Sequence, residues 1–214
     1  MSMEALLRAF GDSGLDCSDV TTPREALRRI AEAGLAVDEG LGPELVQGRP
    51  LIASAEKLVE EATSETFLAG IARPGRLTIA AGLAQIVDLW DLSHESAQQA
   101  DDLGERVHSV YWHGIAHRRE PDAGNASYWF HRVGRHSVFA KLVKEVERMA
   151  STGAIEASCR ELIKGGSWDP RGFIAYSGRS RSGAAERSAR RIQAVEMRLL
   201  FEATLDAILG APEG

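Results

Sequence analysis

Apolar residues recur every three or four positions along most of the chain, and this spacing places them on one face of an α-helix. The stretch that starts at Ser137 is an example, with Val138, Leu142, Val146 and Met149 on one face. No pair of segments alternates apolar and polar residues, and the sequence contains no internal repeat. It therefore predicts an all-α fold, an irregular single-domain helical bundle of roughly seven or eight helices.

Cap and turn signals divide the chain into the predicted helices. The clearest is Thr22-Pro23-Arg24-Glu25, which matches a capping box with proline as the first helical residue. Asn125 is expected to cap a short helix. Gly165-Gly166 and Asp169-Pro170 interrupt the segment 151–183, which we expect to be irregular. The helices are expected at about residues 23–34, from Ser54 onward, 77–100, 105–119, 125–130, from Ser137 onward and 184–209.

The length of the chain fits one domain. Its 214 residues are enough for one sizeable core, so we expect a single helical domain over residues 1–214. The core should lie at about 22–210. The ends, residues 1–21 and 211–214, are expected to be flexible.

Charge and cysteine content restrict the partners and the compartment. The formal net charge of -6 disfavours broad attraction to nucleic acid or to an anionic membrane. Cys17 and Cys159 form no CxxC pattern, which fits a reducing compartment, and the N-terminus has no apolar stretch of signal-peptide length. We therefore expect a soluble cytoplasmic protein that binds neither nucleic acid nor membrane. Its oligomeric state is left open.

Residues 111–136 contain four of the six histidines of the chain, together with four arginines and two tryptophans. His113 and His117 are four residues apart, so on a helix both imidazoles project from one face. Two such nitrogens can bind one first-row metal ion, and His94 on the preceding predicted helix offers a third. The sequence thus predicts a site for a divalent transition metal at His94, His113 and His117.

The spacing of these histidines is similar to that of the metal-binding four-helix bundle proteins induced by DNA damage. Those proteins use one histidine from one helix and an HxxxH pair from another, and the similarity is limited to this spacing. Glu95, Glu120 and Asp122 are further candidates for metal ligands. In the alternative interpretation, the histidines form hydrogen bonds in a polar layer between helices, with Glu120, Asp122 or backbone carbonyls.

The arginines of the same segment indicate a second kind of chemistry. A guanidinium group can bind two oxygens of a carboxylate or phosphate, and it keeps its charge when buried. We expect Arg118, Arg119 and Arg132, together with Asp122 and Asn125, to bind a small anionic ligand. In the alternative interpretation, these arginines form structural ion pairs with acidic neighbours.

Three functions follow from this segment. The first is binding of a small anionic molecule in a pocket rich in histidine, arginine, glutamate and aspartate, with the chemistry unassigned. The second is a metal-dependent or acid-base hydrolase-like enzyme, with His113, His117 and Glu120 as the candidate catalytic residues. The third is a structural or interaction protein that contains a buried polar network. Whether the chain is an enzyme is left open.

The run W-H-x-x-x-H-R-R-E-P-D-x-x-N-x-x-Y-W-F-x-R-V-G-x-H, from Trp112 to His136, resembles a family of uncharacterised bacterial proteins. The segments LWDLSHESAQQ (89–99) and QAVEMRLLFEA near the C-terminus are similar to the same family. The family has HPVF where this chain has HSVF, at residues 136–139. The resemblance implies a shared structure and a bacterial origin. It also joins His94 and the run 112–136 in one signature. It implies no reaction.

Overall fold

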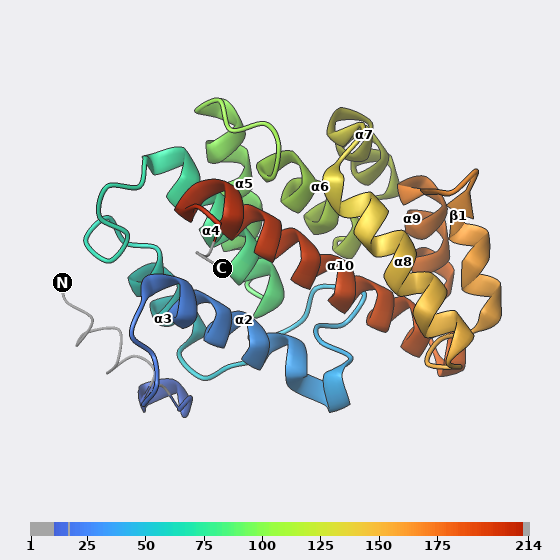
Figure 1. The fold of residues 1–214 in the computed structure, drawn as a ribbon, viewed down its shortest axis with the longest axis horizontal. Helices are drawn as coiled ribbons and strands as arrows, with labels where there is room; N and C mark the ends of the chain where they lie inside the picture. The colour runs from blue at the N-terminus through green and yellow to red at the C-terminus, as the bar shows by residue number, and fades with distance from the viewer. Residues whose placement is uncertain (1–10, 17, 212–214) are drawn as a thin grey trace.

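The computed structural model describes residues 11–16 and 18–211, and within them the fold is all-α, as predicted (Figure 1). Nine α-helices, α2 to α10, lie wholly within these residues, against the roughly seven or eight expected. They are α2 (Pro23–Gly40), α3 (Ala55–Ala62), α4 (Arg73–Ile86), α5 (Trp90–Asp102), α6 (Ser109–Arg119), α7 (Ala123–Val133), α8 (Ser137–Ser151), α9 (Pro170–Arg179) and α10 (Gly183–Leu209). Between α8 and α9 lie a 3-10 helix and a short hairpin, namely η1 (Ala157–Leu162), β1 (Ile163–Lys164) and β2 (Ser167–Trp168).

Helix α10 runs across the middle of the molecule and packs against α2, α4, α8 and α9 (Figure 1). Its inner side is buried, with Phe201 packed against the indole of Trp112 at a ring separation of 6.5 Å. Gly82 of α4 lies against the same two rings, where a Cβ atom would come within 2.9 Å of each. Glycine is therefore what allows α4 to approach the centre of the core so closely.

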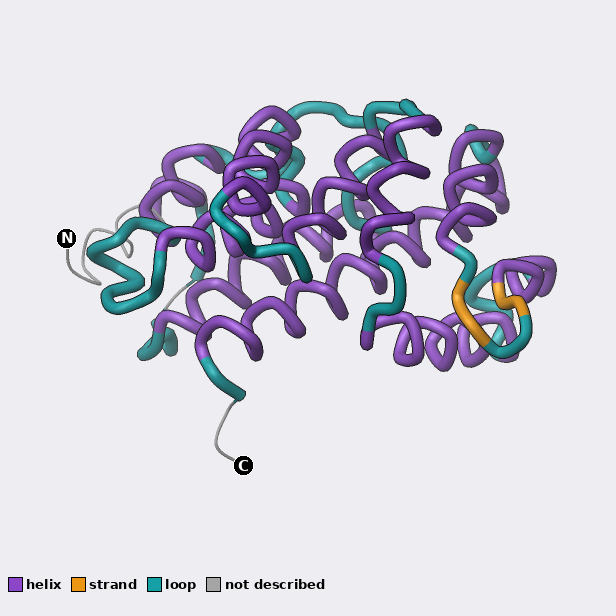
Figure 2. The backbone as a smooth tube through the Cα atoms, turned by 90° about the horizontal axis from the view of Figure 1, so that it is seen from above, coloured by secondary structure: helices purple, strands orange, loops and turns teal. Residues whose placement is uncertain are grey.

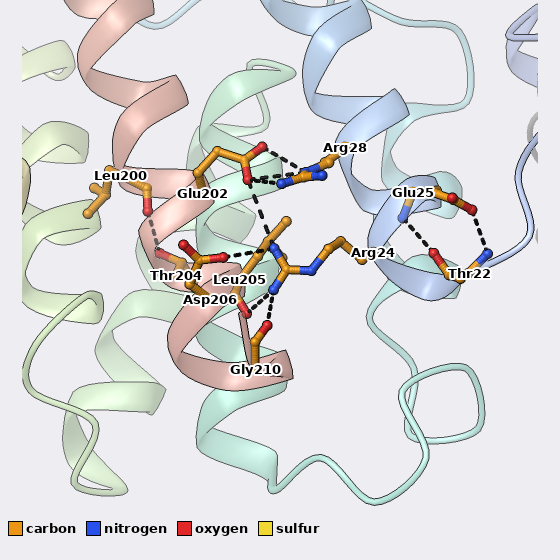
Figure 3. Close-up of polar contacts among 10 residues, drawn as sticks. All are labelled: Thr22, Arg24, Glu25, Arg28, Leu200, Glu202, Thr204, Leu205, Asp206 and Gly210. Carbon is orange, nitrogen blue, oxygen red and sulfur yellow. Dashed lines mark hydrogen bonds and ion pairs between the residues drawn. The ribbon is translucent and has the colours of Figure 1, made fainter. Parts of the chain in front are cut away.

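The capping box at the start of α2 is present as predicted. The amide of Glu25 donates to the hydroxyl of Thr22 at 3.2 Å, and the carboxylate of Glu25 accepts from the amide of Thr22 at 2.9 Å (Figure 3). The helix departs from regular geometry at Val37, close to the predicted end at residue 34.

Two arginines join α2 to the C-terminal end of α10 (Figure 3). Arg24 donates to the carboxylate of Asp206 and to the carbonyl of Leu205, both at 3.0 Å, and to the carbonyl of Gly210. Arg28 binds the carboxylate of Glu202 at 2.6 Å. These contacts hold the start of α2 against the last turns of α10, and Arg24 also gives the Gly210 carbonyl, just beyond the helix, a partner.

The long helix predicted over residues 77–100 is two helices, α4 and α5. The chain breaks at Asp88, whose φ of 63° lies in the left-handed region. The Asp88 carboxylate accepts from the Arg119 guanidinium at 2.8 Å and from the amide of Gly48 at 3.1 Å. Both partners are distant in sequence, so the apolar periodicity on either side of Asp88 gives no sign of the break.

The segment 151–183 is more regular than predicted. Asp169 caps α9 by accepting from the amide of Gly172 at 3.0 Å, and Pro170 is the first helical residue. Gly165 and Gly166, with φ of 57° and 76°, form the turn of the β1–β2 hairpin, which lies at one end of the molecule (Figure 2). Asp169-Pro170 thus starts a helix, and Gly165-Gly166 forms the turn of a hairpin. We expected both pairs only to interrupt the segment.

Three predicted features concern the ends of the chain, the compartment and the cysteines. Parts of the ends expected to be flexible, 1–21 and 211–214, lie outside the described residues, and Cys17 lies outside them too. Cys159 is buried and carries a free thiol. Among the helices that the structure describes, none has the length and apolar character needed to cross a membrane.

Candidate metal centre

The three histidines that the sequence predicts as metal ligands lie together. His94 comes from α5, and His113 and His117 come from α6, which packs against α5. The His94 ring is 4.5 Å from that of His113 and 5.0 Å from that of His117, measured between ring centroids. One nitrogen of each ring lies within 4.8 Å of the others. Three imidazoles from two helices are thus close enough to share one ion.

The cluster sits at the border between core and surface. His113 and His117 are buried, with 1% and 7% of their surface exposed, whereas His94 is half-buried. Nδ1 of His113 has no hydrogen-bond partner among the described residues. Buried polar atoms rarely lack a partner, so this nitrogen points to a group that completes the site.

Burial keeps two of the rings neutral. The pKa of His113 is lowered to about 3, mainly by burial and in addition by the nearby His94, His117 and Arg132. The pKa of His94 is also lowered, first by burial and then by His117, against the opposing effect of Glu120. A histidine binds metal through a neutral imidazole, so both rings are in the ligand form at pH 7.

Glu120 fixes the tautomer of the third histidine. Its Oε2 lies 2.8 Å from Nδ1 of His117. An ionised carboxylate can only accept, so Nδ1 carries the hydrogen and Nε2 of the neutral ring keeps its lone pair. Carboxylates hold metal-binding histidines in this way in known metal sites.

Asp122 lies close to the same group of atoms but has a second role. One oxygen each of Glu120 and Asp122 and one nitrogen of His117 lie within 4.8 Å of one another. The carboxylate of Asp122 also caps α7, accepting from the amide of Asn125 at 2.9 Å and from its side chain at 2.8 Å. Asp122 is therefore the N-cap, the position expected for Asn125.

Two tryptophans flank the histidines. The indole of Trp129 stacks on His113 at 3.8 Å, and that of Trp90 stacks on His94 at 4.9 Å. Nε1 of Trp90 also donates to the carbonyl of Ala116 at 2.8 Å, which ties α5 to α6 beside the cluster. Trp90 has no part in the site predicted from the sequence. Its spacing of four residues from His94 was the available signal.

Arg118 and Arg119 are bound to carboxylates in the interior. Arg118 lies 2.6 Å from Glu196 of α10, and both side chains are almost fully buried. Arg119 lies 2.8 Å from Asp88 and donates to the carbonyl of Glu44 at 2.9 Å. The Arg119 guanidinium is therefore taken up by acidic and carbonyl oxygens, whereas Arg118 binds Glu196 through Nη2 and its buried Nε and Nη1 have no hydrogen-bond partner among the described residues.

Arg132 and Asn125 are also engaged. Arg132 donates to both oxygens of Asp101 at 2.8 Å, and its guanidinium lies 4.5 Å from the ring of Trp129. Arg132, Trp129 and His113 thus form one stack. Asn125 binds Asp122 at the start of α7. Each of the residues predicted to bind an anion has at least one partner among the described residues, and of the arginines it is Arg132 that acts on the histidine cluster through Trp129 and His113.

A surface hollow of about 290 Å³ lies next to the cluster. Trp90, which stacks on His94, and Asp91, whose charge raises the pKa of His94, both line it. Gln47, Glu56 and Asp88 complete its polar lining, and none of the three histidines lines it. The hollow is large enough for a small molecule and meets the centre through Trp90 and Asp91.

Comparison with known protein families, with curated proteins and with solved structures gave no match to this chain.

Proposed function

We propose that this protein binds one divalent first-row transition metal ion through His94, His113 and His117. The observation that carries the proposal is the convergence of one nitrogen from each ring within 4.8 Å. Three nitrogen ligands leave at least one coordination position open, which is the arrangement of catalytic zinc sites. Zinc is therefore the first candidate, although the same ligands suit other metals of the series.

The open position supports hydrolysis as the chemistry. A metal ion held by three imidazoles would supply an activated water for hydrolysis near neutral pH. The carboxylate of Glu120 acts electrostatically on His94 and bonds to His117, so it lies beside the centre. Glu120 would therefore serve as the proton acceptor and His113 and His117 as ligands, and the hollow beside Trp90 would receive the substrate.

A separate observation supports a structural role for Arg118 and Arg119 of the segment 111–136. The Arg118–Glu196 and Arg119–Asp88 pairs are buried and connect α6 to α10 and to the α4–α5 junction. Buried ion pairs of this kind can fix how helices align. We therefore propose that Arg118 and Arg119 fix the orientation of α6, which carries two of the three metal ligands.

Metal analysis of protein purified without an affinity tag tests the metal site. The protein is stripped with a chelator, loaded separately with Zn²⁺, Co²⁺, Ni²⁺ or Mn²⁺, and dialysed before the metal content is measured. We expect one ion per chain in the wild type and loss of that ion in His113→Ala and His117→Ala. His131→Ala is the matched control, because His131 is exposed and outside the cluster.

Two outcomes would overturn the proposal. The first is a wild-type protein that retains well below one equivalent of every metal while its circular dichroism shows a folded helical chain. The second is a His113→Ala variant that keeps as much metal as His131→Ala. Hydrolysis is then tested separately, with the loaded protein and chromogenic phosphate and carboxylate esters.

A further inference from the structure

Two adjoining hollows lie where α7 meets α8, across from the β1–β2 hairpin and the start of α9. Their volumes are about 350 and 260 Å³, and Arg135, Phe139 and Ser167 line both. We call them together the Arg135 groove. None of its lining residues belongs to the candidate metal centre.

The groove carries positive charge that the chain does not neutralise. Arg135 and Arg171 are exposed, and neither guanidinium group has an ion pair or hydrogen bond with any residue that the structure describes, although the backbone amide of Arg171 donates to Asp169. The acidic residue of the lining, Asp169, is held by Lys164 at 2.5 Å and by the amide of Gly172 at 3.0 Å. In a chain of net charge -6, two unpaired guanidiniums beside one hollow favour an anion.

A buried donor without an acceptor lies in the same place. Trp168 lines the smaller hollow and is only 4% exposed, and its indole N–H has no partner among the described residues. The ring is held by Phe173, at 5.3 Å between centroids. A buried N–H without an acceptor is destabilising and uncommon, so an oxygen from a ligand would satisfy it.

The larger hollow offers a second donor of the same kind. Nδ1 of His136 accepts from the amide of Val138 at 3.2 Å, so the neutral ring carries its hydrogen on Nε2. That Nε2 is buried and has no partner in the described part of the chain. Burial and the nearby His108 lower the pKa of His136 to about 4, which keeps the ring neutral at pH 7.

Arg135 and Ser167 line the larger hollow as well, and its wall on α8 is apolar. Phe139, Ala140 and Val143 of α8 form this wall. A ligand that fills both hollows would thus have an oxyanion at one end and an apolar body at the other.

We propose that the Arg135 groove binds a small amphiphilic anion, with its oxyanion on Arg135, Arg171 and the Trp168 N–H and its apolar body on Phe139 and Val143. Carboxylates and phosphate monoesters share this chemistry. The site is separate from the metal centre and does not depend on a metal being bound.

Nuclear magnetic resonance of metal-free protein tests the proposal, because Trp168 reports on its own hydrogen bond. The indole N–H signal that is missing from the spectrum of Trp168→Phe is thereby assigned to Trp168. Phenyl phosphate and benzoate are titrated, with inorganic phosphate, acetate and benzyl alcohol as probes that lack either the apolar body or the charge. We expect a saturable downfield shift of the Trp168 signal with phenyl phosphate or benzoate. The probe that binds more tightly shows whether the groove prefers a phosphate monoester or a carboxylate.

Charge variants complete the test. Arg135→Gln should weaken binding by about 10- to 100-fold, the effect of one charge-assisted hydrogen bond. Arg187→Gln removes the same charge from an exposed position outside the groove and should leave binding unchanged. Absence of a saturable shift with both aromatic anions would overturn the proposal, as would equal weakening in the two variants or equally tight binding of benzyl alcohol.

Discussion

Oε2 of Glu120 lies 2.8 Å from Nδ1 of His117, although Glu120 itself is exposed. Removing this carboxylate should weaken metal binding without removing a ligand. Loss of such a partner typically costs 10- to 100-fold in affinity, so we expect a decrease of about that size in Glu120→Ala. The measurement is a Zn²⁺ titration in competition with a chromophoric chelator.

The control for this change is Glu95→Ala. Glu95 is also exposed and acidic and lies next to His94 in the chain, but its carboxylate accepts from the side chain of Gln99 at 3.0 Å. Its removal should leave the affinity within about twofold of the wild type, since it lies in neither of the two candidate ligand groups. An equal loss in both variants would contradict an orienting role for Glu120.

Protonation of His136 should destabilise the fold in acid. Its pKa of about 4 in the folded protein lies below the ordinary value of 6.5. Between these values the unfolded chain binds more protons than the folded one, so the free energy of unfolding falls as the pH falls. His108 and Glu105 are the titratable groups that act on His136, and Tyr111 and Phe139 pack against it.

His136→Asn should reduce this loss. Asparagine keeps an acceptor for the amide of Val138 and so still caps α8, but it does not titrate. Urea unfolding of the chelated proteins at pH 7, 6, 5 and 4 should give a flatter decline in the variant than in the wild type. His131→Asn, at an exposed position, should decline like the wild type. Parallel curves for His136→Asn and His131→Asn would exclude His136 as a source of the acid sensitivity.

Arg118→Met should destabilise the protein strongly. Among the described residues, the change leaves the buried Glu196 carboxylate with only the hydroxyl of Tyr111, at 2.9 Å, as a partner. Breaking a buried pair in this way costs about 3–5 kcal/mol. Arg148→Met is the control, because the Arg148–Glu145 pair is largely exposed and should contribute less than about 1 kcal/mol.

The double variant Arg118→Met with Glu196→Gln separates the cost of an unpaired charge from the cost of lost packing. It should recover part of the stability, because no charge remains buried without a counterion. The free energy of unfolding from urea titration measures each variant. If Arg118→Met and Arg148→Met had equal effects, the buried pair would not be what stabilises the position of α6.

The parts of the fold that sequence reasoning predicted correctly depend on neighbours within about four residues. The capping box at Thr22 and Glu25 is complete within one turn. The shared face of His113 and His117 follows from helical geometry alone. His94 lies beside them from the preceding helix, α5, and its part in a metal site stays a prediction.

The parts that sequence reasoning missed depend on distant partners. The break at Asp88 is stabilised by Arg119 and Gly48, and the sequence around it continues the helical pattern on both sides. Arg118 looked available for a ligand because its carboxylate partner, Glu196, is 78 residues away. The Arg135 groove was missed for the same reason, since Arg135 and Trp168 belong to elements that meet only in the fold.

The bond from Trp90 Nε1 to the carbonyl of Ala116 has a thermodynamic consequence for the centre. Trp90 stacks on His94, and Ala116 precedes His117, so folding itself brings the ligands of both helices together. A metal ion would then meet a preorganised site, and little binding free energy would be spent on ordering it. The binding free energy would instead stabilise the folded chain, by about 2.7 kcal/mol at a free metal concentration 100 times the Kd. The free energy of unfolding would in this way depend on the metal supply.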